Sequence, residues 1–450
     1  MMSIQKTAGQ SIMSSGGRLP DSPCWTYCDD DIDGVPRIYG DRSAQATYGC
    51  AIGHGGDRGS LVYSIGKDLL PLFHSAHPLA FKMYPVSITE NELEFIRVLF
   101  SSDVAASFTT GEECGLCRKV PYLVLPLAIV SIDGVDRGIL MMQQDYSLKQ
   151  FLLASGTGCN SVSGGIPMEN DMDDEDTSLR SRQSFEPIHS CAVITAIAFQ
   201  LVVAITALNE ELPHLVEGVH CSGFTHNDIH LDNILLDATA GRVGLCDFEL
   251  VAHAPERSPS PLLSPSNSNH NNGPSHSHCN SHESTPTVVP SRLHTRMAPH
   301  RLPPLSRQSP HGLFSRGADT WALALALLSL LTGVDPLFAD ARLMDDFGGG
   351  PLLQRHTDAD GSAPVLDWDA NIHDHILRLL WRDDPSGARV REAGPLLALC
   401  GKCLVNRDGA RACSAVELLY EPLFREYLQA PREAERVLHA WIERRAAGPH

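Results

Sequence analysis

Two long apolar segments stand out in the pattern of hydrophobic and polar positions along the chain. Residues 191–208 carry no charge over 18 positions, and residues 318–333 are mostly Ala and Leu after a single leading aspartate, Asp319. Both segments predict helices. The first is at the lower edge of the length that spans a bilayer, so it fits either a buried core helix or a membrane span. The second is too short to span.

Shorter apolar segments in the first third of the chain predict strands at residues 78–84, 122–131 and 138–144. Residues 89–99 follow the first of these strands and predict a helix. A glycine-rich stretch at residues 52–63 comes before them. Glycine lets a backbone approach a ligand closely, so this stretch is a candidate for covering a bound group. Taken alone, it is also consistent with a plain loop.

The most informative segments are residues 223–237 (GFTHNDIHLDNILLD) and 244–250 (GLCDFEL). They place Asp228 and Asn233 five positions apart, with Asp247 after the next predicted strand. A carboxylate that can accept a hydroxyl proton and hard oxygen ligands for magnesium are what phosphoryl transfer from ATP requires. Asp228 suits the first task, and Asn233 and Asp247 suit the second. The alternative without a catalytic role is an ordinary loop and hairpin in which the Asp and Asn residues form turns.

The pattern His-x-Asp-x-x-x-x-Asn followed by Asp-Phe resembles the signature of the eukaryotic-type protein kinase superfamily. This resemblance implies an α+β, two-lobed, protein-kinase-like fold, with a small β-rich N-lobe and a larger helical C-lobe. It also implies ATP and Mg2+ as cofactors and a protein substrate. In this family the helix before the catalytic loop is buried in the large lobe, which favours the core-helix interpretation of residues 191–208 and argues against a membrane span.

The same resemblance assigns roles in the small lobe. Lys82 would hold the α- and β-phosphates and act in catalysis, with a glutamate of the following helix as its partner. Glu92 is the best match for that partner, Glu94 the second and Glu90 the third, because neighbouring helical positions point in different directions. Further expected contacts with the nucleotide are Gly53, Gly56 and Gly59, whose spacing is irregular for the family, and the hinge residues Met142 and Gln143, preceded by Met141 as gatekeeper.

In the large lobe, Asp319 is in the position that anchors the backbone of the catalytic loop in this family. Residues 295–300 resemble the Ala-Pro-Glu end of an activation segment, except that the glutamate is His300. Arg411 is in the position that usually pairs with that glutamate. We therefore expect this ion pair to be lost or replaced by a weaker contact.

Three departures from the family pattern bear on the activity. Asn227 replaces the arginine before the catalytic Asp, so activity should not need activation-segment phosphorylation. His230, a candidate catalytic residue, replaces a phosphate-contacting lysine, and the pattern His-x-Asp-x-His-x-x-Asn resembles aminoglycoside and choline kinases. Glu249 replaces the glycine after Asp-Phe and puts a carboxylate near the expected magnesium site. The leading functional hypothesis is an active Ser/Thr protein kinase. The second is a pseudokinase that binds nucleotide or acts as a scaffold, and the third is a small-molecule phosphotransferase.

These motifs divide the chain into a flexible N-terminal segment (1–35), an N-lobe (36–141), a C-lobe (142–430) and a C-terminal helix or tail (431–450). The C-lobe carries low-complexity insertions at 155–186 and 254–293. The first is Gly- and Ser-rich and then acidic, which predicts a solvated loop. The second contains serines and a threonine followed by proline, so a proline-directed kinase is an expected partner. These positions are Ser258, Ser260, Ser264 and Thr285.

Composition narrows the class of protein. The net charge of −19 argues against nonspecific binding to nucleic acid or anionic membranes. The 13 cysteines show no regular framework and no secretory signal opens the chain, so we expect an intracellular, cytoplasmic protein. Cys114 and Cys117, with Cys24 and Cys28, are a weak zinc candidate. We expect Cys400 and Cys403, on an apolar helix, to be core thiols.

Overall fold

The computed structural model divides the chain into two compact units. Unit 1 comprises Met1–Ser101, Ala105–Cys114 and Leu125–Gln143, and unit 2 comprises Ser102–Val104, Gly115–Val124 and Gln144–His450. The structure describes residues 26–28, 35–40, 51–55, 59–65, 78–100, 120, 122–154, 185–212, 223–253, 316–333, 373–404 and 413–447.

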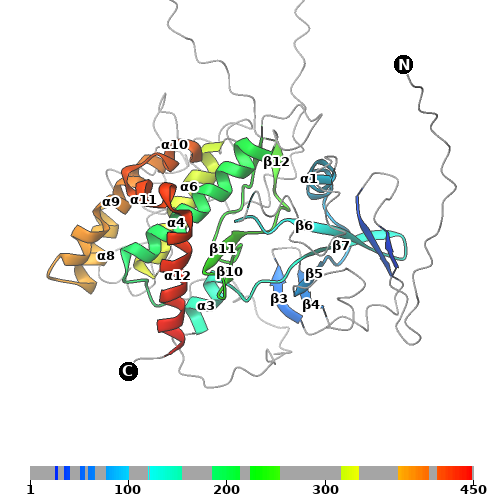
Figure 1. Cartoon of the computed structure of the whole chain (residues 1–450), viewed down its shortest axis with the longest axis horizontal. Helices are drawn as coiled ribbons and strands as arrows, with labels where there is room; N and C mark the ends of the chain where they lie inside the picture. The colour runs from blue at the N-terminus through cyan, green and yellow to red at the C-terminus, as the bar shows by residue number, and fades with distance from the viewer. Residues whose placement is uncertain are drawn as a thin grey trace, which may run out of the picture. The chain divides into compact units, whose positions relative to one another are not determined.

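Unit 1 is built on a seven-stranded sheet with the strand order β1-β2-β6-β7-β5-β4-β3 (Figure 1). All neighbouring strands are antiparallel except β2 and β6, which are parallel. The predicted strands near residues 78–84, 122–131 and 138–144 correspond to β5, β6 and β7, with shifted ends. The strands are β1 (Thr26–Cys28), β2 (Arg37–Gly40), β3 (Ala51–Gly55), β4 (Ser60–Ser64), β5 (Leu79–Met83), β6 (Pro126–Ile132) and β7 (Val135–Met142).

The strand β1 corrects one expectation, because it lies inside the N-terminal segment that was expected to be flexible. Residues Thr26 and Tyr27 favour extended backbone, and they pair with Tyr39 and Ile38 of β2. Strand β2 in turn pairs with β6, which would otherwise be an edge of the sheet. The N-terminal hairpin therefore satisfies the backbone hydrogen bonds of that edge.

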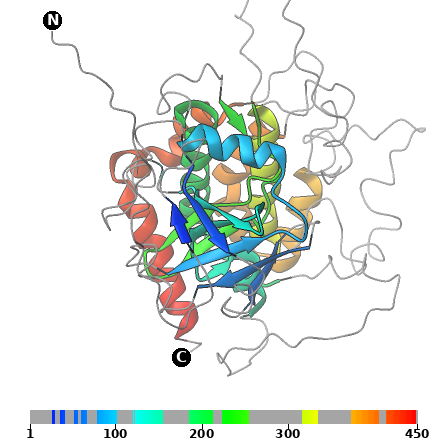
Figure 2. The ribbon, with the colours of Figure 1, turned by 90° about the vertical axis from the view of Figure 1, so that its right-hand side faces the viewer.

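Helix α1 (Glu90–Phe100) is the one helix in the described part of unit 1, and Figure 2 shows it next to the sheet. Thr89 accepts a hydrogen bond from the backbone N–H of Glu92 (3.1 Å), which caps the helix start. Phe95, Ile96 and Leu99 are buried and form its apolar face.

Unit 2 is mainly helical, and α4 runs through its core with α6, α9, α10 and α12 packed against it (Figure 1). Its helices are α3 (Leu148–Ala154), α4 (Cys191–Thr206), the π-helical turn η5 (Ala207–Glu211), α6 (Arg316–Thr332), α8 (His373–Asp383), α9 (Ala388–Cys403), α10 (Ala415–Leu419), η9 (Pro422–Phe424), α11 (Arg425–Gln429) and α12 (Pro431–Ala446). An N-terminal sheet unit and a helical C-terminal unit agree with the α+β prediction at this level.

The long apolar segment is a core helix of unit 2. Among the described residues, Cys191–Glu210 alone has the length and apolarity of a membrane span, and 89% of its most apolar window is buried by protein. The helix also continues past residue 208 through η5. Asn209 continues the helix because its side chain has buried hydrogen-bond partners there.

Two small sheets complete unit 2: β8 (Tyr146–Ser147), β10 (Ile234–Asp237) and β11 (Arg242–Leu245) form one, and β9 (Phe224–Thr225) and β12 (Ala252–His253) form the other.

Helix α12 packs against α4 and β11, so this part of the expected C-terminal helix or tail belongs to the core of unit 2. The reason is its apolar face, on which Ala434, Leu438 and Ile442 are buried. The last two residues of the expected insertion 155–186 are also attached to this unit. Phe185 donates a backbone hydrogen bond to Gly333, and Glu186 pairs with Arg445 at 3.1 Å.

Candidate active site

The loop between β9 and β10 carries Asp228 and His230, two of the predicted catalytic residues, and Asp319 at the start of α6 holds its backbone. The backbone N–H groups of His226 and Asn227 donate to the Asp319 carboxylate at 2.9 to 3.1 Å. Asp319 is fully buried, and burial raises the pKa of its carboxyl. The predicted anchoring of the loop backbone by Asp319 is confirmed.

Asn209 in η5 is a second support of this loop, and it was not evident from the sequence. Its Nδ2 donates to Asp319 Oδ2 (3.0 Å) and to the carbonyl of Phe224 (2.6 Å). The backbone passes so close that a Cβ on Gly223 would lie 1.8 Å from the Asn209 carbonyl oxygen, and Gly223 has a φ of 118°. Glycine is therefore required where the chain enters β9.

His226 is buried and neutral in this arrangement. Its Nδ1 accepts the backbone N–H of Asp228 (3.3 Å), so its Nε2 carries the proton and donates to the Cys246 carbonyl (2.9 Å). Burial lowers the pKa of the imidazole, against the opposing charges of Asp319 and Asp228. The ring also packs against Phe248 with centroids 5.4 Å apart. His226 thus links the loop to the segment that follows β11.

Asp228 and Asn233 are directly joined, as their spacing suggested. Asn233 Nδ2 donates to the Asp228 carboxylate (3.0 Å) and to its carbonyl (2.9 Å). Because the nitrogen of this amide is engaged, its oxygen is the end that could bind a cation. The Asp228 side chain is 24% exposed, so a hydroxyl group can reach it.

Asp247 is brought next to Asn233 by the pairing of β10 with β11. Ile234 pairs with Leu245, and the N–H of Cys246 donates to the Asn233 carbonyl (3.0 Å). Asp247 is the next residue and accepts the backbone N–H of Glu249 at 3.4 Å. An amide oxygen and a carboxylate are hard ligands of the kind that Mg2+ prefers, so Asn233 and Asp247 fit the predicted metal role. Glu249 is two residues from Asp247 and half-buried.

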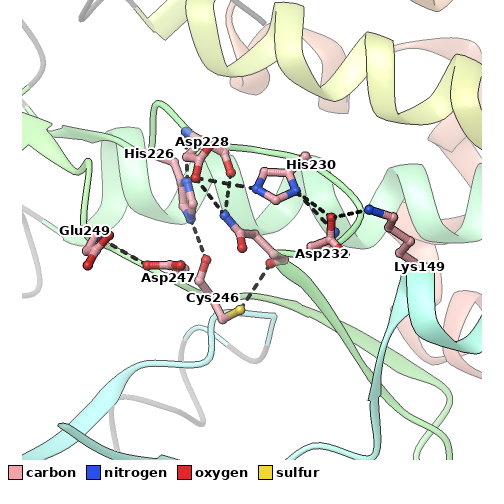
Figure 3. A network of polar contacts seen from close by, with 9 residues as sticks. Lys149, His226, Asp228, His230, Asp232, Cys246, Asp247 and Glu249 are labelled. Carbon is pink, nitrogen blue, oxygen red and sulfur yellow. Dashed lines mark hydrogen bonds and ion pairs between the residues drawn. The ribbon is translucent and has the colours of Figure 1, made fainter. Parts of the chain in front are cut away.

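His230 lies between two carboxylates (Figure 3). Its Nε2 is 3.5 Å from Asp228 Oδ2, and its Nδ1 is 3.4 Å from Asp232 Oδ2. Lys149 of α3 pairs with Asp232 on the far side at 3.0 Å. Burial acts to raise the pKa of Asp232, but hydrogen bonds and charge from His230 and Lys149 outweigh it and lower the pKa to about 2. The contribution of Asp232 and Lys149 was not evident from the sequence.

In unit 1, Lys82, Tyr84 and Glu92 form a buried polar group. Lys82 in β5 is 3% exposed and Glu92 in α1 is fully buried, whereas Glu90 and Glu94 are exposed. This burial favours Glu92 among the three candidate partners of Lys82. The Tyr84 hydroxyl donates to Glu92 Oε2, and Lys82 Nζ lies 4.8 Å from the centre of the Tyr84 ring.

The expected nucleotide-contacting glycines lie at the β3–β4 hairpin. Gly53 is within β3, at an irregularity in the register, and Gly59 precedes β4 with a φ of 68°. Gly56 lies outside the described residues. Met142 ends β7 opposite Leu79, and the N–H of Gln143 donates to the Pro78 carbonyl at 2.9 Å.

Several predictions fall on residues outside the described part of the chain: the 254–293 insertion, residues 155–184, His300, Arg411, and Cys24, Cys114 and Cys117 of the zinc candidate. Within the described part, no group of three or more His, Cys, Asp or Glu residues could hold a metal ion. Cys400 and Cys403 are buried free thiols, as predicted.

Backbone strain concentrates at the same site in unit 2. Three non-glycine residues in the described part have positive φ, and two of them are Asn227 (64°) and Asp247 (68°). Such conformations persist only where surrounding contacts over-determine them, and they cluster at functional sites.

The residues predicted from the sequence are assembled in two sets. Unit 2 contains Asp228, His230, Asn233 and Asp247, and unit 1 contains Lys82 and Glu92.

A comparison of the chain with protein-family models finds no matching family, and a comparison with curated proteins finds no relative.

Proposed function

We propose that this protein is a protein-kinase-like phosphotransferase that moves the γ-phosphate of ATP to Ser/Thr hydroxyls of a protein substrate. The observation that carries this proposal is the Asp228–Asn233 pair. The amide nitrogen of Asn233 holds the Asp228 carboxylate, which leaves the amide oxygen as the end that would bind a metal together with Asp247. Phosphoryl transfer depends on this combination of a positioned proton acceptor and hard metal ligands.

Asp228 accepts the proton of the attacking hydroxyl in this proposal. The hydrogen bond from Asn233 fixes the orientation of the Asp228 carboxylate. The Asp319 carboxylate fixes the loop backbone by accepting the N–H groups of His226 and Asn227, and we call this contact the Asp319 clamp. Positioning supplies most of the catalysis in phosphoryl transfer, because the protein does little covalent chemistry. A buried carboxylate that holds two backbone N–H groups supports such a rigid loop.

Asn233 and Asp247 are the residues that would hold Mg2+, which when bound neutralises charge on the phosphates. In unit 1, the roles proposed for Lys82 and Glu92 are phosphate binding and support of that lysine. A fully buried Glu92 together with a nearly buried Lys82 favours these roles, because buried charges are costly unless partners compensate them. Gly53, Gly56, Gly59, Met142 and Gln143 complete the proposed nucleotide contacts.

Two classes of molecule compete as the acceptor of the phosphate: a protein substrate and a small hydroxyl compound. His230 contacts Asp228 and is the residue that resembles small-molecule kinases. The clamp by Asp319 supports the protein-kinase alternative, since this anchor was expected from that family. We therefore place the protein substrate first and a small hydroxyl compound second.

Transfer of labelled γ-phosphate should be measured with three acceptors: a generic Ser/Thr protein substrate, choline and an aminoglycoside. The proposal expects transfer to the protein substrate and its loss when a chelator removes Mg2+. Transfer to choline or the aminoglycoside alone would replace the protein-kinase assignment with the small-molecule one. Nucleotide binding without transfer to any acceptor, including the protein itself, would identify a pseudokinase scaffold.

A further inference from the structure

Asn227 joins the catalytic loop to the segment that follows Asp247. Its Nδ2 donates to three oxygens: the Leu250 carbonyl (2.9 Å), the Thr225 hydroxyl (3.0 Å) and the Thr225 carbonyl (3.2 Å). An amide nitrogen has two hydrogens, so one of them is shared between two acceptors. The residue is 6% exposed, and these bonds are therefore shielded from water.

The same region is closed by a second set of contacts. β12 pairs with β9, with Ala252 opposite Thr225, and the Thr225 hydroxyl lies 3.3 Å from the Ala252 carbonyl. The N–H of Val251 donates to the Phe248 carbonyl at 3.1 Å. Asn227 thus ties Leu250, in the turn between Asp247 and β12, to Thr225 of β9.

Asn227 also has a backbone conformation that few residue types adopt. Its φ of 64° is disfavoured for most residues and tolerated by Asn, and its backbone N–H is held by Asp319. Its Oδ1 is buried and has no hydrogen-bond partner among the described residues. A buried acceptor without a partner is costly, so the donor side of the amide must be what holds the side chain in place.

We propose that Asn227 is a positioning residue: its neutral amide locks the segment from Asp247 to Val251 onto the loop that carries Asp228. Because the lock consists of hydrogen bonds within the fold, it holds Asp247 in register without a phosphoryl group added elsewhere in the chain. The lock stands on geometry alone, whereas its consequence for catalysis rests on the proposed phosphotransferase function.

Hydrogen exchange tests the lock without relying on activity. In Asn227→Gly, which accepts the positive φ but lacks the amide, the backbone amides of residues 250–253 should exchange at least tenfold faster. Those of β10 and β11 should remain unchanged. The matched control is Asp133→Gly, a second positive-φ position, which should leave residues 250–253 as they are in the wild type. Unchanged protection of these residues in Asn227→Gly would overturn the proposal.

Thr225→Val provides a milder variant if Asn227→Gly does not fold. It keeps the side-chain shape but removes the hydroxyl contact, so exchange at residues 250–253 should rise by a smaller factor. No rise in this variant would also count against the lock. Phosphatase treatment of the wild type should leave the protection of these residues unchanged, and loss of protection would show that an added charge holds the segment.

Activity separates the lock from the function it serves. If the wild type transfers phosphate, Asn227→Gly should lower kcat about tenfold or more and raise KM for Mg2+-ATP, because Asp247, a proposed Mg2+ ligand, loses its position. KM for the protein substrate should stay within about twofold. Wild-type kcat in Asn227→Gly would remove the catalytic consequence of the lock. If the wild type transfers nothing, the proposed function fails, and hydrogen exchange still decides whether the lock exists.

Discussion

At the scale of single residues, the candidate sites are built from charged and polar groups removed from water. Glu92, His226 and Asp319 are fully buried, and each has at least one specific hydrogen-bond partner. Burying such groups is costly unless their hydrogen bonds are made. The partners of these residues are therefore where substitutions should have their largest effects.

Tyr84→Phe tests the polar group in unit 1. The variant removes the hydroxyl that donates to the buried Glu92 carboxylate, which should lower the free energy of unfolding by about 1–3 kcal/mol. KM for ATP should rise as well, because Glu92 and Lys82 both contact Tyr84. Denaturant unfolding and ATP titration check these effects, with Tyr420→Phe as the control, since Tyr420 is 77% exposed. Equal stability of both variants would contradict the assigned contact.

The burial of His226 predicts that the stability of the folded protein falls in acid. Burial lowers its pKa from the usual 6.5, so the unfolded chain binds a proton that the folded protein does not. Stability contributed by the neutral imidazole should be present above about pH 6.5 and decline at lower pH, approaching about 1.4 kcal/mol per pH unit. His226→Gln should show a shallower decline between pH 6.5 and 5, and the half-exposed His439→Gln should follow the wild type. Parallel curves for all three proteins would refute this prediction.

The sequence identified Asp228, Asn233 and Asp247 because short, fixed spacings place them on one loop and one hairpin, and Asp319 because its helix resembles one of the protein-kinase family. It did not identify the parts played by Asn209, Tyr84 or Lys149. Their hydrogen-bond partners lie on other elements, 110 residues away for Asn209 and Asp319. Such contacts depend on how helices pack, which no local pattern encodes.

At the scale of elements, α12 is the helix whose importance the sequence concealed. Glu435 accepts a hydrogen bond from Arg242 Nε (2.8 Å), and Arg445 lies over the rings of Phe151 and Trp441. The helix therefore contacts both β11, which leads to Asp247, and α3, which carries Lys149. Its apolar residues are sparse and interrupted by charges, so its burial was not evident from hydrophobicity.

Gly241→Ala tests the contact between α12 and the β10–β11 turn. Gly241 has a φ of 65°, and an added Cβ would lie 2.2 Å from the Glu435 carbonyl oxygen. We expect a loss of about 2 kcal/mol or more from strain and displacement of α12. The matched control is Gly394→Ala in α9, where no atom lies within 4 Å and stability should rise by about 0.5–1 kcal/mol. Equal free energies of unfolding of the two variants in urea would argue against the close approach of Gly241 to the Glu435 carbonyl.

The elements that the sequence predicted best are those with long or strongly apolar patterns. The helices α1, α4 and α6 and the strands β5 and β7 correspond to predicted segments. By contrast, β1 and β2 were not predicted, because short strands gain their stability from partners distant in sequence. The π-helical η5 also depends on tertiary contacts, since Asn209 is polar and would ordinarily favour ending a helix.

At the scale of the whole molecule, a sheet unit and a helical unit each assemble one part of the predicted chemistry. Lys82 and Glu92 meet in unit 1, and Asp228, Asn233 and Asp247 meet in unit 2. Each unit keeps its polar group buried or tightly hydrogen-bonded, as a pre-organised site requires. The proposed phosphotransferase function assigns phosphate binding to the set in unit 1, and proton acceptance and metal binding to the set in unit 2.

The most direct test is the rate of γ-phosphate transfer from Mg2+-ATP to a Ser/Thr protein substrate by the wild type, Asp228→Asn and Asp133→Asn. We predict that Asp228→Asn lowers the rate by about 100-fold or more, because it removes the proton acceptor. It should leave ATP binding within about twofold. Asp133→Asn neutralises a carboxylate in the β6–β7 turn and should match the wild type. Full activity in Asp228→Asn would contradict the role of Asp228 as the proton acceptor.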